Sequence, residues 1–117
     1  MNQQEIEKYE LIAESVFELF KNKNFDTIAK EYDYALKYGR DTALAIEEDL
    51  NKASKELHAE PSNIFKLEPG ITIKSFDEGM FDVLIEISIQ LKQGGLLIEL
   101  IKQKSSGLYL EDISTFT

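Results

Sequence analysis

The spacing of apolar residues along this chain changes once, near Pro69. Before that point, apolar side chains recur every three or four positions, as they do on the buried face of an amphipathic helix. After it, they alternate with polar side chains, as they do in a strand with one buried face. This order predicts an α+β fold in which helices precede an antiparallel sheet.

Two of the expected helices are clearly marked. Residues 4–22 carry an apolar stripe that includes Val16 and Phe20, which predicts the first helix. Another helix is expected after Asp41 or Thr42, either of which can accept a backbone hydrogen bond at a helix start, and it should end at residues 58–61.

A further helix is expected between these two. The polar run at residues 22–24 ends in Asn24, a good N-cap, so this helix should begin near Phe25. Leu36 continues its apolar side, and Gly39 stands where a left-handed C-terminal cap would close it. The chain therefore predicts three N-terminal helices.

Four strands are expected in the second half, at residues 71–76, 81–92, 96–104 and 108–115. Turn residues separate them, at Asp77-Glu78-Gly79, Gly94-Gly95 and Ser105-Ser106-Gly107. Consecutive hairpins of this kind form a four-stranded antiparallel meander. The three helices should pack on the one face that carries Val83, Ile85, Ile87 and Ile89.

Composition sets limits on the class of protein. A chain of 117 residues, 43% hydrophobic and 30% charged, fits a single domain spanning residues 1–117. Its net charge of −9 opposes contact with phosphate backbones and anionic lipids and favours a basic partner. We therefore expect neither direct nucleic-acid binding nor membrane binding. The acidity has a plainer explanation too, since it also keeps a protein soluble.

Localisation is predicted from what the sequence lacks. There is no cysteine, which suits a reducing compartment. Residues 1–5 lack the basic start and apolar run of a secretory signal. A cytoplasmic protein is expected.

Motifs that carry chemistry are missing. His58 is the sole histidine, and without cysteine the usual nucleophilic triads cannot be built. Gly94 and Gly95 fall between strands, not in a phosphate-binding loop that opens a helix. The carboxylates lack the spacing of a calcium loop. We expect no catalytic residue, no cofactor and no metal.

One enzyme-like alternative remains open. Helices that lead into a curved sheet can form a cone around a small ligand, as in folds that resemble nuclear transport factor 2. Polar groups for such a pocket would come from Tyr32, Asp33, Tyr34 and Tyr38. An apolar pocket of this kind raises a carboxyl pKa and so favours proton transfer.

Carboxylates gather along the first helix and elsewhere. Glu7, Glu10, Glu14 and Glu18 fall at intervals of three and four residues, which places them on one helix face. A nearly unmixed acidic face suits a basic partner, and it also suits simple solvation. The candidate partner-binding residues are Glu14, Glu18, Glu47, Glu48, Asp77, Glu78 and Asp82.

Several segments carry a family resemblance. They are residues 16–20, 24–28, 83–87, 97–100 and 108–113. In their order, these parts resemble small bacterial immunity proteins that neutralise toxins delivered by contact-dependent growth inhibition systems. The resemblance implies a cytosolic protein that binds a cognate toxin domain, basic and nuclease-like, and blocks it without catalysis.

An open meander also leaves two outer strands with unpaired backbone groups. Such an edge can pair with a partner strand or with a second copy of the chain. A homodimer through an edge strand is therefore a further expectation.

Overall fold

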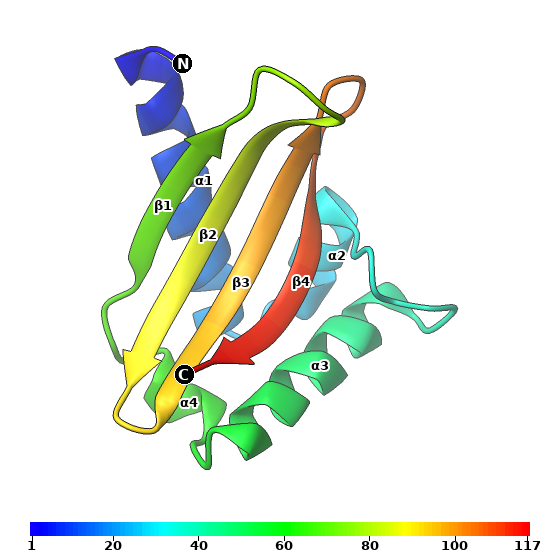
Figure 1. Ribbon diagram of the computed structural model, residues 1–117. Helices are drawn as coiled ribbons and strands as arrows, with labels where there is room; N and C mark the ends of the chain where they lie inside the picture. The colour runs from blue at the N-terminus through cyan, green and yellow to red at the C-terminus, as the bar shows by residue number, and fades with distance from the viewer.

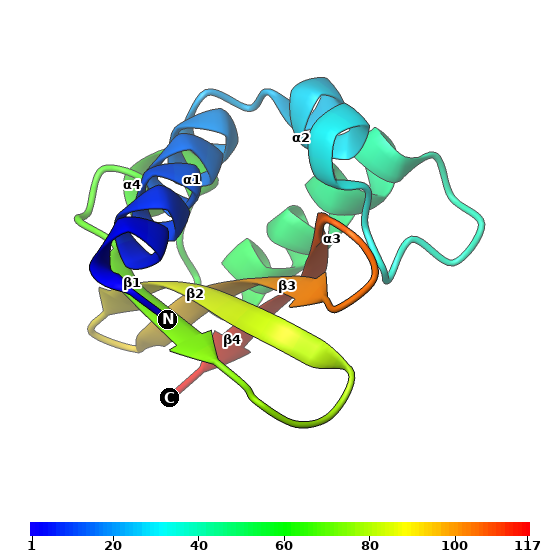
Figure 2. The same cartoon turned by 90° about the horizontal axis from the view of Figure 1, so that it is seen from above.

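The computed structural model describes residues 1–117 and contains a helical layer on one face of a single sheet (Figures 1 and 2). The helices are α1 (Gln3–Lys21), α2 (Phe25–Tyr32), α3 (Thr42–Glu56) and α4 (Pro61–Ile64). The strands are β1 (Gly70–Ser75), β2 (Phe81–Leu91), β3 (Gly94–Gln103) and β4 (Leu108–Phe116). The strands pair antiparallel in the order β1-β2-β3-β4. The predicted α+β meander is confirmed, with the short α4 as an addition.

Polar caps fix where the two long helices begin. The Asn2 side chain accepts a hydrogen bond of 2.9 Å from the Glu5 backbone N–H, and α1 starts directly after it. The Asp41 side chain accepts one of 3.1 Å from Leu44 N–H at the start of α3, as predicted. Each cap satisfies a backbone donor that has no partner within its helix.

The prediction that the second helix extends to Gly39 is wrong. α2 ends at Tyr32, and Asp33 follows with a φ of 56°. Tyr34 then forms a parallel bridge with Leu110, and Ala35 N–H donates a 2.9 Å hydrogen bond to the Leu110 carbonyl. The chain leaves the helix because the backbone here pairs with the outer edge of β4.

A polar network ties the segment after α2 to α3. The Tyr34 hydroxyl donates a 2.6 Å hydrogen bond to Asp49, and the two Arg40 Nη atoms reach the same carboxylate at 3.0 and 3.2 Å. Burial would raise the pKa of Asp49, but the hydrogen bonds from Arg40 and Tyr34 outweigh it and lower the pKa below its usual value. Tyr34 is 2% exposed, whereas the side chains of Asp49 and Arg40 are 23% and 31% exposed, so this network lies at the margin of the core.

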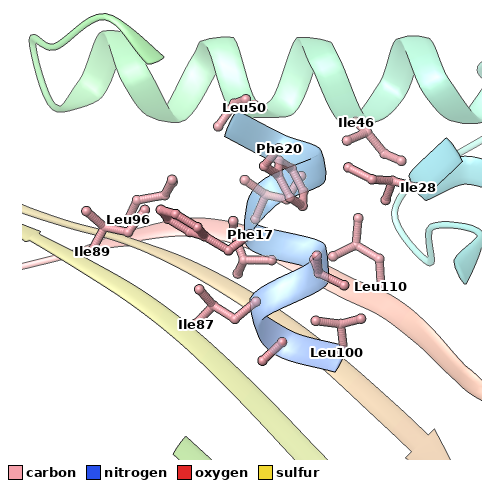
Figure 3. Packing of buried hydrophobic residues seen from close by; sticks show 14 of the residues in the cluster. Phe17, Phe20, Ile28, Ile46, Leu50, Ile87, Ile89, Leu96, Leu100 and Leu110 are labelled. Carbon is pink, nitrogen blue, oxygen red and sulfur yellow. The ribbon is translucent and has the colours of Figure 1, made fainter. Parts of the chain in front are cut away.

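The inner face of the sheet carries the core. Ile85, Ile87 and Ile89 are at most 1% exposed, which confirms the predicted alternation along β2. They belong to a cluster of 24 buried apolar residues that fills the space between helices and sheet (Figure 3). Phe17 and Phe20 of α1 reach into its centre.

Aromatic rings hold α1 to its neighbours. The Phe17 and Phe20 ring centroids lie 5.4 and 6.0 Å from that of Phe65, just after α4. Phe20 also meets the Phe25 ring of α2 edge-on at 6.3 Å. Aromatic pairs at these separations stabilise a fold by more than the burial of their apolar area alone.

The hairpin between β2 and β3 turns at Lys92 and Gln93, so the predicted turn at Gly94-Gly95 is wrong. Leu91 pairs with Gly94, and Ile87 therefore lies opposite Ile98. A turn centred on the glycines would instead bring Lys102 opposite Ile87 on the buried face. Burial of apolar partners thus sets the register. Glycine is still favoured at position 94, because the φ of Gly94 is 143°, a value that residues with a side chain rarely adopt.

Candidate functional site

Figure 1 looks onto the sheet face that the helices leave uncovered. Because side chains alternate between the two faces of a strand, this open face carries the residues between the buried ones. The strand register arranges them in rows that cross the sheet. One row is acidic, and the rows beside it contain apolar side chains.

The acidic row consists of Glu86, Glu99 and Asp112. Glu86 of β2 lies directly opposite Glu99 of β3, and Glu99 lies opposite Asp112 of β4. The register shifts after Glu99, so that β4 has one extra residue, Glu111, beside the row. Like charges that face each other across strands destabilise a sheet. The row therefore detracts from the stability of the isolated chain.

Electrostatics single out Glu99 at the centre of the row. Partial burial raises its pKa, and the neighbouring charges of Asp112, Glu86 and Glu111 raise it further. Lys74 is the one cation that acts against them, and its Nζ lies 2.8 Å from the Glu86 carboxylate. Three neighbouring carboxylates and one lysine thus act in opposite directions on the Glu99 pKa.

Apolar side chains border the acidic row on both sides. Leu84, Ile101 and Tyr109 form the next row toward one end of the strands, in register with one another. Ile101 is 8% exposed although it lies on the uncovered face. Toward the other end, Leu97 and Phe116 are half-buried. The open face therefore offers negative charge between apolar contacts.

The structure places the predicted partner-binding residues in three other regions. Glu14 and Glu18 are exposed on α1, and Glu47 and Glu48 are exposed on α3. Asp77 and Glu78 lie in the loop between β1 and β2, and Asp82 lies at the start of β2. These regions do not meet on one surface of the sheet.

Two of those carboxylates already have cationic partners. Glu48 lies 3.5 Å from the Arg40 guanidinium, and Asp82 lies 2.9 Å from Lys102 Nζ. Their charge is partly neutralised within the chain. They are therefore weaker candidates for attracting a basic partner than the crowded row on the open face.

Sequence reasoning missed Glu99 and Asp112 because it misplaced the turn before β3. The sequence contained the information needed to find Glu99. If the apolar residues of β2 are paired with those of β3, Glu86 lies opposite Glu99. The bulge at Glu111 gave no signal, because nothing in the spacing of β4 marks an extra residue.

The side chains proposed for a cone-shaped pocket serve other roles. Tyr34 and Tyr38 border an open groove of about 480 Å³ between α3 and β4. The Tyr34 hydroxyl is committed to Asp49, and Tyr38 is 80% exposed. Asp33 is exposed and pairs with Lys37 Nζ at 2.9 Å. The interior they would have faced is filled by the apolar core.

The structure holds no group of three or more histidine, cysteine or carboxylate side chains that could bind a metal ion. None of its helices has both the length and the apolar character required to cross a bilayer.

Comparison of the chain with protein-family models, with curated proteins and with solved structures finds no match.

The crowded row has a measurable effect on stability. Because the folded state raises the Glu99 pKa, ionisation of Glu99 opposes folding, and stability falls as pH rises through that pKa. We predict that Glu99→Gln raises the melting temperature at pH 7. The gain should shrink toward about pH 4, where the native carboxyl is protonated. Thermal unfolding across this range measures both; a gain of the same size at every pH would contradict the electrostatic origin.

Proposed function

We propose that this chain is an immunity protein that binds a basic toxin domain through the open face of its sheet and blocks it. The observation that carries the proposal is the row of Glu86, Glu99 and Asp112, whose charges face one another across three strands. Lysine or arginine side chains of a partner would relieve this repulsion on binding. The repulsion lowers the stability of the free chain, and its relief on binding would favour the complex.

Charge decides which kind of partner fits this face. A nucleic acid or an anionic lipid surface would bring further negative charge to a chain whose net charge is already −9. A second copy would bring its own acidic row. A basic protein surface complements both the carboxylates and the apolar rows beside them, and that pairing of charge with apolar contact is typical of specific interfaces.

The toxin class comes from the resemblance to immunity proteins of contact-dependent growth inhibition systems. Such a protein acts in the cytoplasm and covers the active site or substrate surface of a nuclease-like domain, with no chemistry of its own. The cone-shaped ligand-binding alternative gains no support from the side chains proposed for it, which serve as core and surface contacts.

Co-expression tests this proposal. The polypeptide encoded directly upstream of this chain would be expressed with and without it, and growth and complex formation would be measured. We expect growth to stop with the upstream polypeptide alone and to resume when this chain is present, with a stable complex on gel filtration. An upstream polypeptide that is toxic yet neither bound nor neutralised would overturn the proposal.

Self-association has a separate route, through the outer edge of β1. This edge strand forms no backbone–backbone hydrogen bond outside its pairing with β2. Lys74 lies on this strand, and an edge lysine opposes pairing with another sheet. A homodimer through β1 therefore stays secondary to the toxin complex in our proposal.

A further inference from the structure

Three large apolar side chains are exposed within six residues, in the loop between β1 and β2 and at the first residue of β2. Phe76 is 41% exposed, Met80 is 70% exposed, and Phe81 is 39% exposed. We name residues 76–81 the hairpin tip. Single exposed apolar residues are common on protein surfaces, but a cluster of aromatic and methionine side chains is typical of sites that bind another protein.

Hydrogen bonds hold the hairpin tip in place at both ends. Phe76 N–H donates to the Asp82 carbonyl at 3.0 Å, which closes the loop at its base. Lys104, from the turn between β3 and β4, donates from its backbone N–H to the Met80 carbonyl at 3.2 Å and from Nζ to the Asp77 carbonyl at 3.1 Å. A loop held in this way loses less conformational entropy on binding than a free one.

Two carboxylates and the Lys104 ammonium lie beside the exposed apolar groups. Asp77 and Glu78 are exposed and form no ion pair within the chain. The tip therefore combines apolar anchors with two free carboxylates. A lipid surface with anionic headgroups would repel these carboxylates, and a second copy would oppose them with the same charges.

We infer that the hairpin tip is a second docking element for the basic protein partner, inserting Phe76 and Met80 into an apolar pocket rimmed by lysine or arginine. This inference rests on the proposed function. The acidic row would supply attraction over a broad face, and the tip would supply the buried anchors that dominate the energy of most interfaces. Asp77 and Glu78 would pair with the rim of the pocket.

The test measures the binding of two double variants to the polypeptide encoded directly upstream. Phe76→Ser with Met80→Ser removes the anchors, whereas Leu11→Ser with Leu44→Ser removes two apolar side chains that are 66% and 49% exposed on α1 and α3. All four positions are exposed, so both variants should keep the wild-type melting temperature. We expect the tip variant to bind about 30-fold or more weakly, as loss of a hot-spot residue does. The control should bind like the wild type.

The outcomes separate this inference from the proposed function. Failure of the wild-type chain to bind or neutralise the upstream polypeptide would overturn both. Wild-type binding with equal affinity of the tip variant would overturn the docking role of the tip alone. Two further measurements test whether the tip instead binds a lipid surface or a second copy of the chain. Binding of the wild type to vesicles of phosphatidylcholine and phosphatidylserine would overturn the inference. A dimer that the tip variant abolishes would overturn it too.

Discussion

Replacing Ile85 by aspartate is expected to destabilise the domain strongly. Ile85 is 0% exposed and lies on the inner face of β2, opposite Leu100. A buried carboxylate without a partner costs several kcal/mol, or it takes up a proton and still lacks hydrogen bonds. A domain of this size is stable by only about 5–15 kcal/mol. We expect a loss of at least about 4 kcal/mol, measured as the urea midpoint followed by circular dichroism.

Glu86→Ala is the matched control, because Glu86 is the next residue along the same strand. Its side chain is 23% exposed on the open face, where it pairs with a half-exposed Lys74 and faces Glu99. Losing the ion pair with Lys74 and losing the repulsion from Glu99 act in opposite directions. The free energy of unfolding should therefore change by less than about 0.5 kcal/mol. Equal urea midpoints for the two variants would show that the assignment of faces is wrong.

Reversing charge on the open face should slow capture of the proposed toxin partner. Long-range attraction chiefly raises the rate of association, and salt weakens it by shortening the screening length to about 8 Å at physiological ionic strength. With Glu99→Lys and Asp112→Lys together, we expect the association rate at low salt to fall about tenfold or more. The dissociation rate should change less. Stopped-flow mixing at several salt concentrations measures both rates.

Glu14→Lys with Glu18→Lys provides the comparison, because it changes the net charge by the same amount on exposed positions of α1. Its smaller effect would locate the encounter surface on the open face. Glu47→Lys with Glu48→Lys tests α3 in the same way. If all three variants associate at the same rate as the wild type, and salt has no effect, the acidity serves solubility alone.

The sequence predicted the fold well because local rules and the buried pattern agree along most of it. In β2, alternation alone assigned every inward residue from Val83 to Ile89. The prediction failed where a tertiary contact had more influence than the local sequence pattern. The continuation of α2 toward Leu36 looked helical, yet pairing of Tyr34 with Leu110 and the bond from its hydroxyl to Asp49 ended the helix.

The candidate site was harder to predict than the fold. A cross-strand row depends on register, and a shift of the β2–β3 turn by two residues changes which charges meet. The predicted acidic residues on α1 and α3 were visible as runs in the sequence. The row of Glu86, Glu99 and Asp112 joins residues from three strands, so it becomes visible only when all three are paired.

The position of β4 has a consequence for how the chain is made. α2 and α3 pack against β4, which is the last strand to leave the ribosome (Figures 1 and 2). All of α4, β1, β2 and β3 is synthesised between α3 and β4, which at about 5–20 residues per second takes several seconds. During that interval the apolar sides of α2 and α3 lack their strand. The contacts of α2 and α3 with Leu110 and Ile113 can therefore form only at the end of this interval, after the rest of the sheet has been made.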